Sequence, residues 1–427
     1  MTFFPRASRT VAGISVLAVL FVVGGAATAA LAVSTAWSPP ANVSATGNNK
    51  NLHIAVDGAG LATAVWDNFD GTHLSVQASS SLNGAQWSSP VTVSTTENND
   101  TPQIGVDGSG RATAVWEHND GINLIVQASY SVNGAAWSAP VTVSSPGYNT
   151  YAQLTVDGSG LATAVWISLG TATNNTVQAS YSVNGATWSA PATLATILGG
   201  ISHPQITVDG SGRVTALWND AGLKASSSLN GATWSAPVAV SAGESASDAQ
   251  ITVDGLGRAT AVWTVDGGQG RVLRASSSLP GAAWSTPTNL SVDGQNAGQP
   301  QVTVDGSGRV TAVWSGYNGT IGILEASTSL DGVAWSIPAE LSAAGQDASS
   351  PQITVDGSGL ATAIWLGSDD GDIYGVHAST SLNGAPWSAP VTISTPGQDE
   401  NQPQIAADKS GFAAAAWLLT DGDNFIV

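Results

Sequence analysis

The chain has 427 residues and a formal net charge of −19, from 11 basic and 30 acidic side chains. This acidity argues against nucleic acid or an anionic membrane surface as a partner. The sequence contains no cysteine, which excludes structural disulfides and thiolate chemistry, so stability must come from burial and backbone pairing. Only 10% of the residues are charged, so uncharged polar residues and glycine must build most of the surface.

The first 32 residues have the pattern of a secretory signal peptide. Arg6 and Arg9 form a basic start, residues 11–23 an apolar stretch, and residues 27–32 contain small-residue cleavage sites. We predict that residues 1–32 are removed and that the mature chain is secreted or held at the cell surface. Because the apolar stretch nearly reaches spanning length, an uncleaved membrane anchor is the alternative, and no membrane span is expected in the mature chain.

Two motifs alternate along the rest of the chain and use every tryptophan. The first is Trp-Ser-x-Pro, at Trp37, Trp87, Trp137, Trp188, Trp234, Trp284, Trp335 and Trp387. The second is Asp-Gly-x-Gly followed by a short strand that ends in Trp66, Trp116, Trp166, Trp218, Trp263, Trp314, Trp365 or Trp417. In most repeats the period is about 50 residues, the length range of propeller blades.

In the second repeat we expect strands at residues 103–106, 111–116, 123–129 and 137–144, named A, B, C and D. Asp-Gly-Ser-Gly joins A to B and Asn-Gly joins C to D, and both sequences suit tight turns with positive φ. Strand B alternates Ala and Trp with Thr and Val, so both of its faces can be buried. A sheet buried on both faces must stack on copies of itself, as propeller blades do.

The sequence therefore predicts an all-β fold, a single eight-bladed β-propeller of four-stranded antiparallel blades over residues 33–427. The mature chain opens on a D-type strand at Trp37 and closes on A, B and a partial C at residues 424–427. We expect the N-terminal strand to complete the last blade, which removes exposed sheet edges. A seven-bladed propeller is the alternative.

The C–D hairpin at residues 329–336 reads Ser-Leu-Asp-Gly-Val-Ala-Trp-Ser, with parallels at residues 81–87, 131–137 and 381–387. It resembles the Asp-box, Ser-x-Asp-x-Gly-x-Thr-Trp, of the sialidase and BNR-repeat β-propellers. The resemblance extends from about residue 36 to the end of the chain and implies a hairpin that stabilises each blade. The hairpin is one residue shorter here, and Asn replaces Asp in most copies, which favours a non-catalytic member of this superfamily.

In such a blade the A–B and C–D hairpins lie on one face of the ring, and the more variable B–C and D–A loops lie on the other, where function is expected. Sialidases gather three arginines around a carboxylate. Four arginines follow A–B turns on the repetitive face: Arg111, Arg213, Arg258 and Arg309. Only Arg271 and Arg274 remain for the variable face, so the resemblance to the sialidases does not extend to their three-arginine site.

Carboxylates on the variable face are abundant, without a distinctive pair: Asp67, Asp70, Asp100, Glu117, Asp120, Asp248, Asp369 and Asp399. An extracytoplasmic glycoside hydrolase of sialidase-like fold would need two that face each other across a sugar. The sequence therefore identifies no catalytic residues and leaves enzyme activity open. The aspartates of the Asp-Gly-x-Gly turns are instead expected to accept backbone N–H bonds.

Candidate ligand-binding residues come from two groups. Strand A begins with Gln in most repeats and His53 in the first, forming a ring near the central channel in which we single out His53, Gln103 and Gln205; hydrogen bonds between blades are the alternative role. The second group is aromatic and lies in or beside the variable loops: Phe69, Tyr148, Tyr151, Tyr317 and Tyr374. A binding function predicts several of these aromatic side chains in one pocket.

We therefore expect a monomeric binding module for a carbohydrate or a surface protein, with no required cofactor. A structural or adhesive repeat protein without a small ligand is the alternative. Calcium is the one candidate ion, because two Gly-containing loops concentrate hard oxygen ligands. The carboxylates of these loops are Asp369, Asp370, Asp372, Asp421 and Asp423, without the spacing of an EF-hand.

Overall fold

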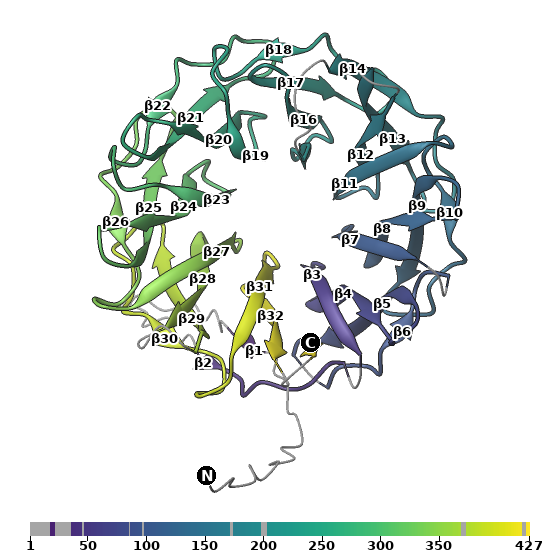
Figure 1. The fold of residues 1–427 in the computed structure, drawn as a ribbon, viewed down its shortest axis with the longest axis horizontal. Helices are drawn as coiled ribbons and strands as arrows, with labels where there is room; N and C mark the ends of the chain where they lie inside the picture. The colour runs from purple at the N-terminus through teal and green to yellow at the C-terminus, as the bar shows by residue number, and fades with distance from the viewer. Residues whose placement is uncertain are drawn as a thin grey trace, which may run out of the picture.

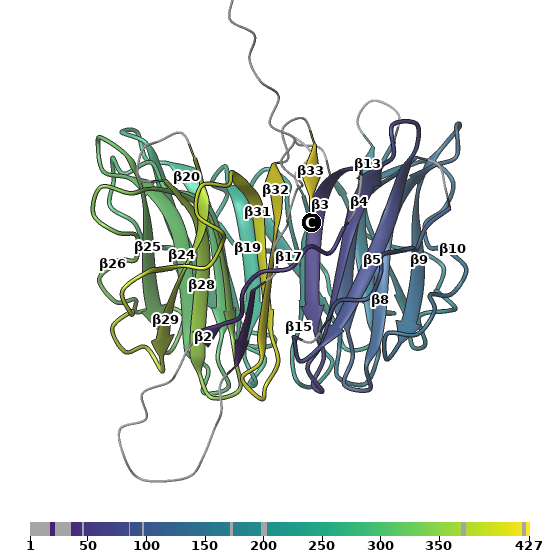
Figure 2. The same cartoon turned by 90° about the horizontal axis from the view of Figure 1, so that it is seen from below.

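The computed structural model describes residues 18–21, 36–44, 47–84, 86–95, 98–170, 174–197, 203–368, 373–420 and 424–427. These residues form β-sheets that stand side by side in a ring around an open centre (Figure 1). The strands run between the two faces of the ring (Figure 2). The predicted all-β propeller is thereby confirmed. Within the described ranges, no helix has the length and hydropathy needed to cross a membrane.

In most sheets four consecutive strands pair, and the first lies nearest the centre (Figure 1). Two such sets, at residues 99–142 and 148–197, are joined into one eight-stranded sheet by a single parallel bridge between Leu124 and Tyr148. The innermost strands are β3 (Asn48–Val56), β7 (Asn99–Val106), β11 (Tyr148–Val156), β15 (Gln205–Val208), β19 (Ser247–Val253), β23 (Gly298–Val304), β27 (Asp347–Val355) and β31 (Glu400–Ala407). The second strands are β4 (Leu61–Phe69), β8 (Arg111–Asn119), β12 (Ala162–Leu169), β16 (Val214–Asn219), β20 (Ala259–Asp266), β24 (Val310–Tyr317), β28 (Leu360–Ser368) and β32 (Ala413–Thr420).

The third strands are β5 (Leu74–Leu82), β9 (Leu124–Val132), β13 (Asn175–Ser182), β17 (Leu223–Ser228), β21 (Arg271–Ser278), β25 (Gly322–Ser329) and β29 (Gly375–Leu382). The strands at the rim are β6 (Val91–Thr92), β10 (Val141–Thr142), β14 (Ala192–Ile197), β18 (Val238–Ala239), β22 (Thr288–Asn289), β26 (Ala339–Glu340) and β30 (Val391–Thr392). Most rim strands have only two residues, shorter than the expected strand D, because Trp-Ser-x-Pro places a proline without an N–H just before them.

The sheet that contains the first and last described strands has the order β2 (Ala36–Trp37), β1 (Ala18–Phe21), β32, β31, and β33 (Phe425–Ile426) also pairs with β32. β1 lies against residues 413–415 of β32, and β33 lies against residues 419–420. β1 and β33 therefore share the third-strand position of this sheet. The sequence instead predicts residues 424–427 alone at this position and places residues 18–21 in a signal peptide. β2 pairs with β1.

The core lies between neighbouring sheets. In one cluster, Leu217 and Leu223 of the β15–β18 sheet pack against Trp263 and Val265 of the next sheet. The second strands are buried along most of their length on both faces, as their alternating Ala, Thr, Val and Trp predict. Their tryptophans are almost completely buried: Trp66, Trp116, Trp166, Trp218, Trp263, Trp314, Trp365 and Trp417. One large ring per sheet therefore fills the space that opens between twisted sheets.

The turns of the repetitive face have the predicted chemistry. Asn133 and Gly134 have φ of 52° and 69°, as a tight hairpin between twisted strands requires. In the Asp-box-like hairpin of residues 329–336, Asp331 Oδ1 accepts the backbone N–H groups of Val333 and Ala334 at 2.9 and 2.8 Å. The Ser329 hydroxyl accepts the N–H of Gly332 at 2.8 Å. This hairpin is therefore closed by its own Ser and Asp side chains.

The aspartates of the A–B turns accept backbone hydrogen bonds, as predicted. In one of them, Asp356 Oδ1 accepts the N–H groups of Ser358 and Leu360 at 2.8 and 3.0 Å and the Ser358 hydroxyl at 2.7 Å. We expect Asp356→Ala to lower the free energy of unfolding by about 1–3 kcal/mol, because buried donors lose their acceptor. Asp356→Asn keeps an acceptor oxygen, so its free energy of unfolding, measured in urea, should fall by less than half as much. Equal losses in the two variants would contradict this role.

Candidate functional site

A β-bulge precedes the Gln or His position in seven of the innermost strands. In each, one residue two positions earlier has positive φ: Asn51, Thr101, Tyr151, Asp248, Gln299, Ser350 and Gln402. A bulge inserts one residue and re-aims the side chains beside it. These innermost strands therefore begin several residues before the expected start of strand A. Their bulges lie around the central opening.

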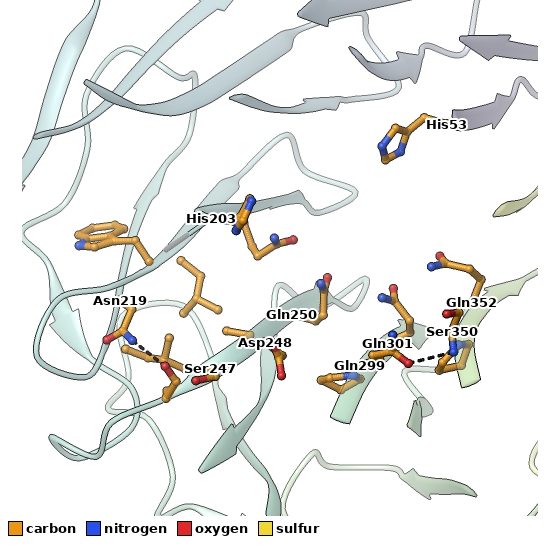
Figure 3. A pocket seen from close by; sticks show the side chains of 18 of the residues that line it. His53, His203, Asn219, Ser247, Asp248, Gln250, Gln299, Gln301, Ser350 and Gln352 are labelled. Carbon is orange, nitrogen blue, oxygen red and sulfur yellow. Dashed lines mark hydrogen bonds between the residues drawn. The ribbon is translucent and has the colours of Figure 1, made fainter. Parts of the chain in front are cut away.

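A cavity of about 1050 Å³ lies at this end of the central channel. Figure 3 shows His53, His203 and several glutamines around it. Its lining contains one ring position from each of six sheets: His53, Gln205, Gln250, Gln301, Gln352 and Gln404. Gln103 does not line it; instead its amide nitrogen lies 3.1 Å from Nε2 of His53. Within the ring, the contact of Gln103 with His53 therefore joins two sheets, and the other glutamines named above face the cavity.

The wall of the cavity is almost uncharged. Burial lowers the pKa of His53 to about 4, so its imidazole is neutral at physiological pH. Burial also lowers the pKa of His203. The lining contains one carboxylate, Asp248, which pairs with Arg271 at 2.9 Å. The site is therefore suited to a neutral polar ligand rather than to an ion.

Some polar lining groups hold the wall itself. Oε1 of Gln299 accepts the backbone N–H of Ser350 in the next sheet at 2.9 Å. The amide of Asn219 donates to the carbonyl of Ala246 at 2.6 Å, also between neighbouring sheets (Figure 3). These bonds fix the positions of neighbouring cavity residues relative to one another, as a preorganised binding site requires.

The predicted aromatic residues do not gather in this cavity. Phe69, Tyr148 and Tyr317 are 42%, 56% and 45% exposed and belong to three different sheets. The Tyr374 hydroxyl donates to Asp347 at 2.8 Å. Tyr151 packs against His203, with ring centroids 4.0 Å apart. Tyr151 therefore supports the wall through His203 but is not itself part of the lining, and the ligand-binding role of all five aromatic residues stays a prediction.

Two of the candidate carboxylates are held by structural hydrogen bonds, Asp67 fully buried and Asp100 partly exposed. Asp67 accepts the side-chain amide of Asn51 at 2.7 Å and the backbone N–H of Thr101 at 3.1 Å. Asp100 accepts the same amide at 2.9 Å and pairs with Lys50 at 3.0 Å. Burial, and secondly Asp100, raise the pKa of Asp67 well above its ordinary value. This pair supports the bulge of β7 and does not line the cavity.

Glu117 has the same role one sheet further on. It accepts the backbone N–H of Tyr151 at 2.6 Å and the Thr150 hydroxyl at 3.1 Å. Burial raises its pKa, against the lowering effect of these bonds. In both cases the acid that follows the tryptophan of strand B holds the bulge of the next repeat. This structural role accounts for Asp67 and Glu117, which the sequence alone offers as candidates for catalysis.

Arginines do not converge in the described part of the chain. Arg271 pairs with Asp248, and Arg274 contacts Glu244 on the same loop. Arg258 and Arg309 lie 4.0 and 3.9 Å from the aspartates of their own A–B turns. No three-arginine arrangement is formed by these residues.

The predicted calcium ligands Asp369, Asp370, Asp372, Asp421 and Asp423 lie outside the described residues. Within the described ranges, no three His, Asp or Glu side chains come together as metal ligands would. Calcium binding therefore stays a prediction.

The sequence analysis missed one side of the cavity. Residues 217–223 and 243–248 contribute to the lining beside the ring positions. A signal for them exists in the repeat: Trp218 and Trp263 are 45 residues apart, whereas Trp66 and Trp116 are 50 apart. A shortened repeat leaves space where the other repeats fill it.

No protein-family model and no curated protein sequence matches the chain. Among solved structures, it is similar to the BP39L lectin from Burkholderia pseudomallei, with 12% identity and a TM-score of 0.55 over 82% of this chain and 100% of the lectin. It is similar to a PL25 ulvan lyase, with 10% identity and a TM-score of 0.52 over 90% of this chain and 97% of the lyase.

A microbial sialidase, Hz136, matches with 14% identity and a TM-score of 0.40 over 62% of this chain, and the match covers 63% of the sialidase's length. At such low identities the similarity concerns the fold alone. The two structures with TM-scores above 0.5 support the β-propeller fold, and the resemblance to the sialidase and BNR-repeat propellers rests on the Asp-box-like hairpins.

Proposed function

We propose that this chain is a secreted, eight-bladed β-propeller that binds a neutral carbohydrate in the cavity at the end of its central channel. The observation that carries the proposal is the almost uncharged, amide-rich lining of a cavity of about 1050 Å³. An amide offers a donor and an acceptor at once, which suits the paired hydrogen-bonding capacity of sugar hydroxyls. Pockets for small ligands typically have about 300–1,000 Å³, so the volume suffices.

The blade count and the closure rest on the contacts of the N-terminal segment. Val43 and Ser44 donate their backbone N–H groups to the carbonyl of Val427 at 2.9 and 3.0 Å, and the Ser44 hydroxyl accepts the N–H of Val427 at 2.9 Å. Ser144 makes the corresponding hydroxyl contact with Val126 in the second repeat. The segment from Trp37 to Ser44 therefore acts as strand D of an eighth blade.

The lectin and the ulvan lyase have names that point to carbohydrates, which supports the same ligand class for this chain. Binding without catalysis is the better proposal, because Asp67 and Glu117 use their carboxylates to hold neighbouring bulges. The two arginines of the variable face are likewise paired with acids. Secretion follows from the signal pattern of residues 1–32.

The direct test is a glycan array on residues 33–427, repeated with calcium and with a chelator. We expect neutral glycans to bind, and calcium to change the thermal midpoint only if the acidic loops hold it. Silence of the whole array, with no shift of the midpoint by any soluble glycan, would reject the carbohydrate proposal and favour a structural or adhesive role.

A further inference from the structure

One sheet of the ring is shorter than the others at the cavity face. In seven of the second strands, the strand continues for three residues beyond its tryptophan, as β8 does from Trp116 to Asn119. β16 continues for one residue, from Trp218 to Asn219. Its partner β17 is shortened to match, because Asn219 pairs directly with Leu223. The β16–β17 hairpin therefore ends two residues below its neighbours, a step of about 7 Å at ~3.3 Å per residue.

The cavity extends into this step. From the sheets of His53, Gln301, Gln352 and Gln404 it takes three residues each, all from the innermost strand. From the short sheet it also takes Leu217, Trp218, Asn219, Ala221, Gly222 and Leu223 of the second and third strands and their turn. The strands of a sheet succeed one another from the centre to the rim (Figure 1). Because the lining includes residues of the second and third strands of the short sheet, the cavity has an arm that runs outward across this sheet.

The loop from Gly243 to Asp248 forms the other bank of this arm. A Cβ placed on Gly222 would lie 3.1 Å from the Cα of Gly243, so the turn and the loop touch. A Cβ placed on Gly243 would meet nothing within 4 Å, so its outer side is open. Asn219 bonds to Ala246 beneath the arm. The contact of Arg274 with Glu244 and the pair of Arg271 with Asp248 tie the loop to β21.

The accessible surface of the arm is made of small residues. Leu217, Trp218 and Leu223 lie beneath the arm and are almost completely buried, so they support its floor without offering a surface to a ligand. Ala221, Gly243 and Ser245 are exposed on the two banks. Small side chains and exposed backbone groups leave room for a chain of sugar rings and can form hydrogen bonds with its hydroxyls.

On the basis of the carbohydrate function proposed above, we infer that the ligand is an extended oligosaccharide with one end among the ring glutamines and the following units in the arm over the short sheet. The off-centre arm favours an oligosaccharide over a monosaccharide, because a monosaccharide would occupy only the space between the ring positions. Specificity for chain length would then come from residues 219–223 and 243–248, and recognition of the end unit from the ring.

Because the chain has no cysteine, single Ser→Cys variants give unique chemical reporters. Ser245→Cys reports on the arm, Ser350→Cys on the ring, and Ser89→Cys is a matched control on the exposed start of a rim segment. Each thiol is alkylated with iodoacetamide alone and with β-1,4-linked hexasaccharides of glucose, N-acetylglucosamine, mannose or xylose, or with their monosaccharides. We expect at least one hexasaccharide to slow alkylation tenfold or more at Ser245→Cys and Ser350→Cys, and its monosaccharide only at Ser350→Cys.

The outcomes separate the two proposals. Protection at Ser350→Cys alone by hexasaccharides overturns the arm and leaves the carbohydrate function standing. Protection at neither position overturns both, and equal protection at Ser89→Cys marks non-specific adsorption and also overturns both. As a second measurement, Ser245→Trp should fill the arm and weaken hexasaccharide binding at least tenfold while monosaccharide binding is unchanged; unchanged hexasaccharide binding overturns the arm.

Discussion

Glu400→Gln should raise the thermal midpoint by several degrees at pH 8 and leave it nearly unchanged at pH 4.5. Glu400 is 3% exposed, and its carboxyl oxygens make no well-aligned hydrogen bond among the described residues, although the indole of Trp417 lies close enough to have a small lowering effect on its pKa. Burial, and secondly the charge of Asp399, raise its pKa from 4.5 to about 8. In two other sheets the same position holds Asn99 and Asn149, which accept the indole N–H of Trp116 and Trp166 at 3.0 and 3.1 Å.

The sign follows from the raised pKa. Below pH 4.5 the group is protonated in both the folded and the unfolded chain, so it does not affect stability. As the pH rises from 4.5 to about 8, only the unfolded chain releases the proton, and the folded state loses stability. Glutamine removes this loss, which is on the order of 4 kcal/mol at pH 8 because the pKa rises from 4.5 to about 8 and each pKa unit counts ~1.4 kcal/mol. Calorimetric scans across this range measure it.

The matched control is Glu340→Gln, because Glu340 is exposed on β26. It should change the midpoint by less than one-third as much at pH 8. A Glu400→Gln variant with the same pH dependence as the unmodified chain would show that this carboxyl is ionised in the fold.

Trp263→Ala should lower the free energy of unfolding by about 3–5 kcal/mol, the usual cost of removing a large buried ring. Trp263 is fully buried between two sheets, and its indole nitrogen has no hydrogen-bond partner among the described residues, so the loss is one of packing. Trp284→Ala provides the comparison within the same cluster, because Trp284 is only partly buried. Its loss should be less than half as large in urea unfolding. Equal losses would contradict the placement of the core between the sheets.

The repeated features of the fold could be predicted from the sequence because the same local chemistry recurs at the same spacing. Asp356 accepts hydrogen bonds within its own turn, and Asn133 and Gly134 form a tight hairpin from local φ preference alone. Each of these interactions joins residues a few positions apart. Their role does not depend on which sheets become neighbours, so a single sequence suffices.

The site was less predictable because it depends on contacts between sheets. The sequence identified His53 and Gln205 as ring residues, and both line the cavity. It could not separate Asp67 and Glu117 from catalytic acids, since their partners Thr101 and Tyr151 belong to the next repeat and bond through bulged backbone. The arm could not be predicted because a comparison of the motifs shows only what the repeats have in common. The arm forms where one repeat has fewer residues than the others.

The most direct test of the account is isothermal titration calorimetry of residues 33–427 with a glycan that the array identifies, repeated with Gln301→Ala combined with Gln352→Ala. Loss of two half-buried hydrogen-bonding amides at about 1 kcal/mol each should weaken binding at least tenfold. Gln86→Ala, an exposed glutamine next to Trp87 and away from the cavity, should bind as the unmodified chain does. Equal affinity of the double variant and the unmodified chain, with equal unfolding midpoints, would contradict binding at the ring.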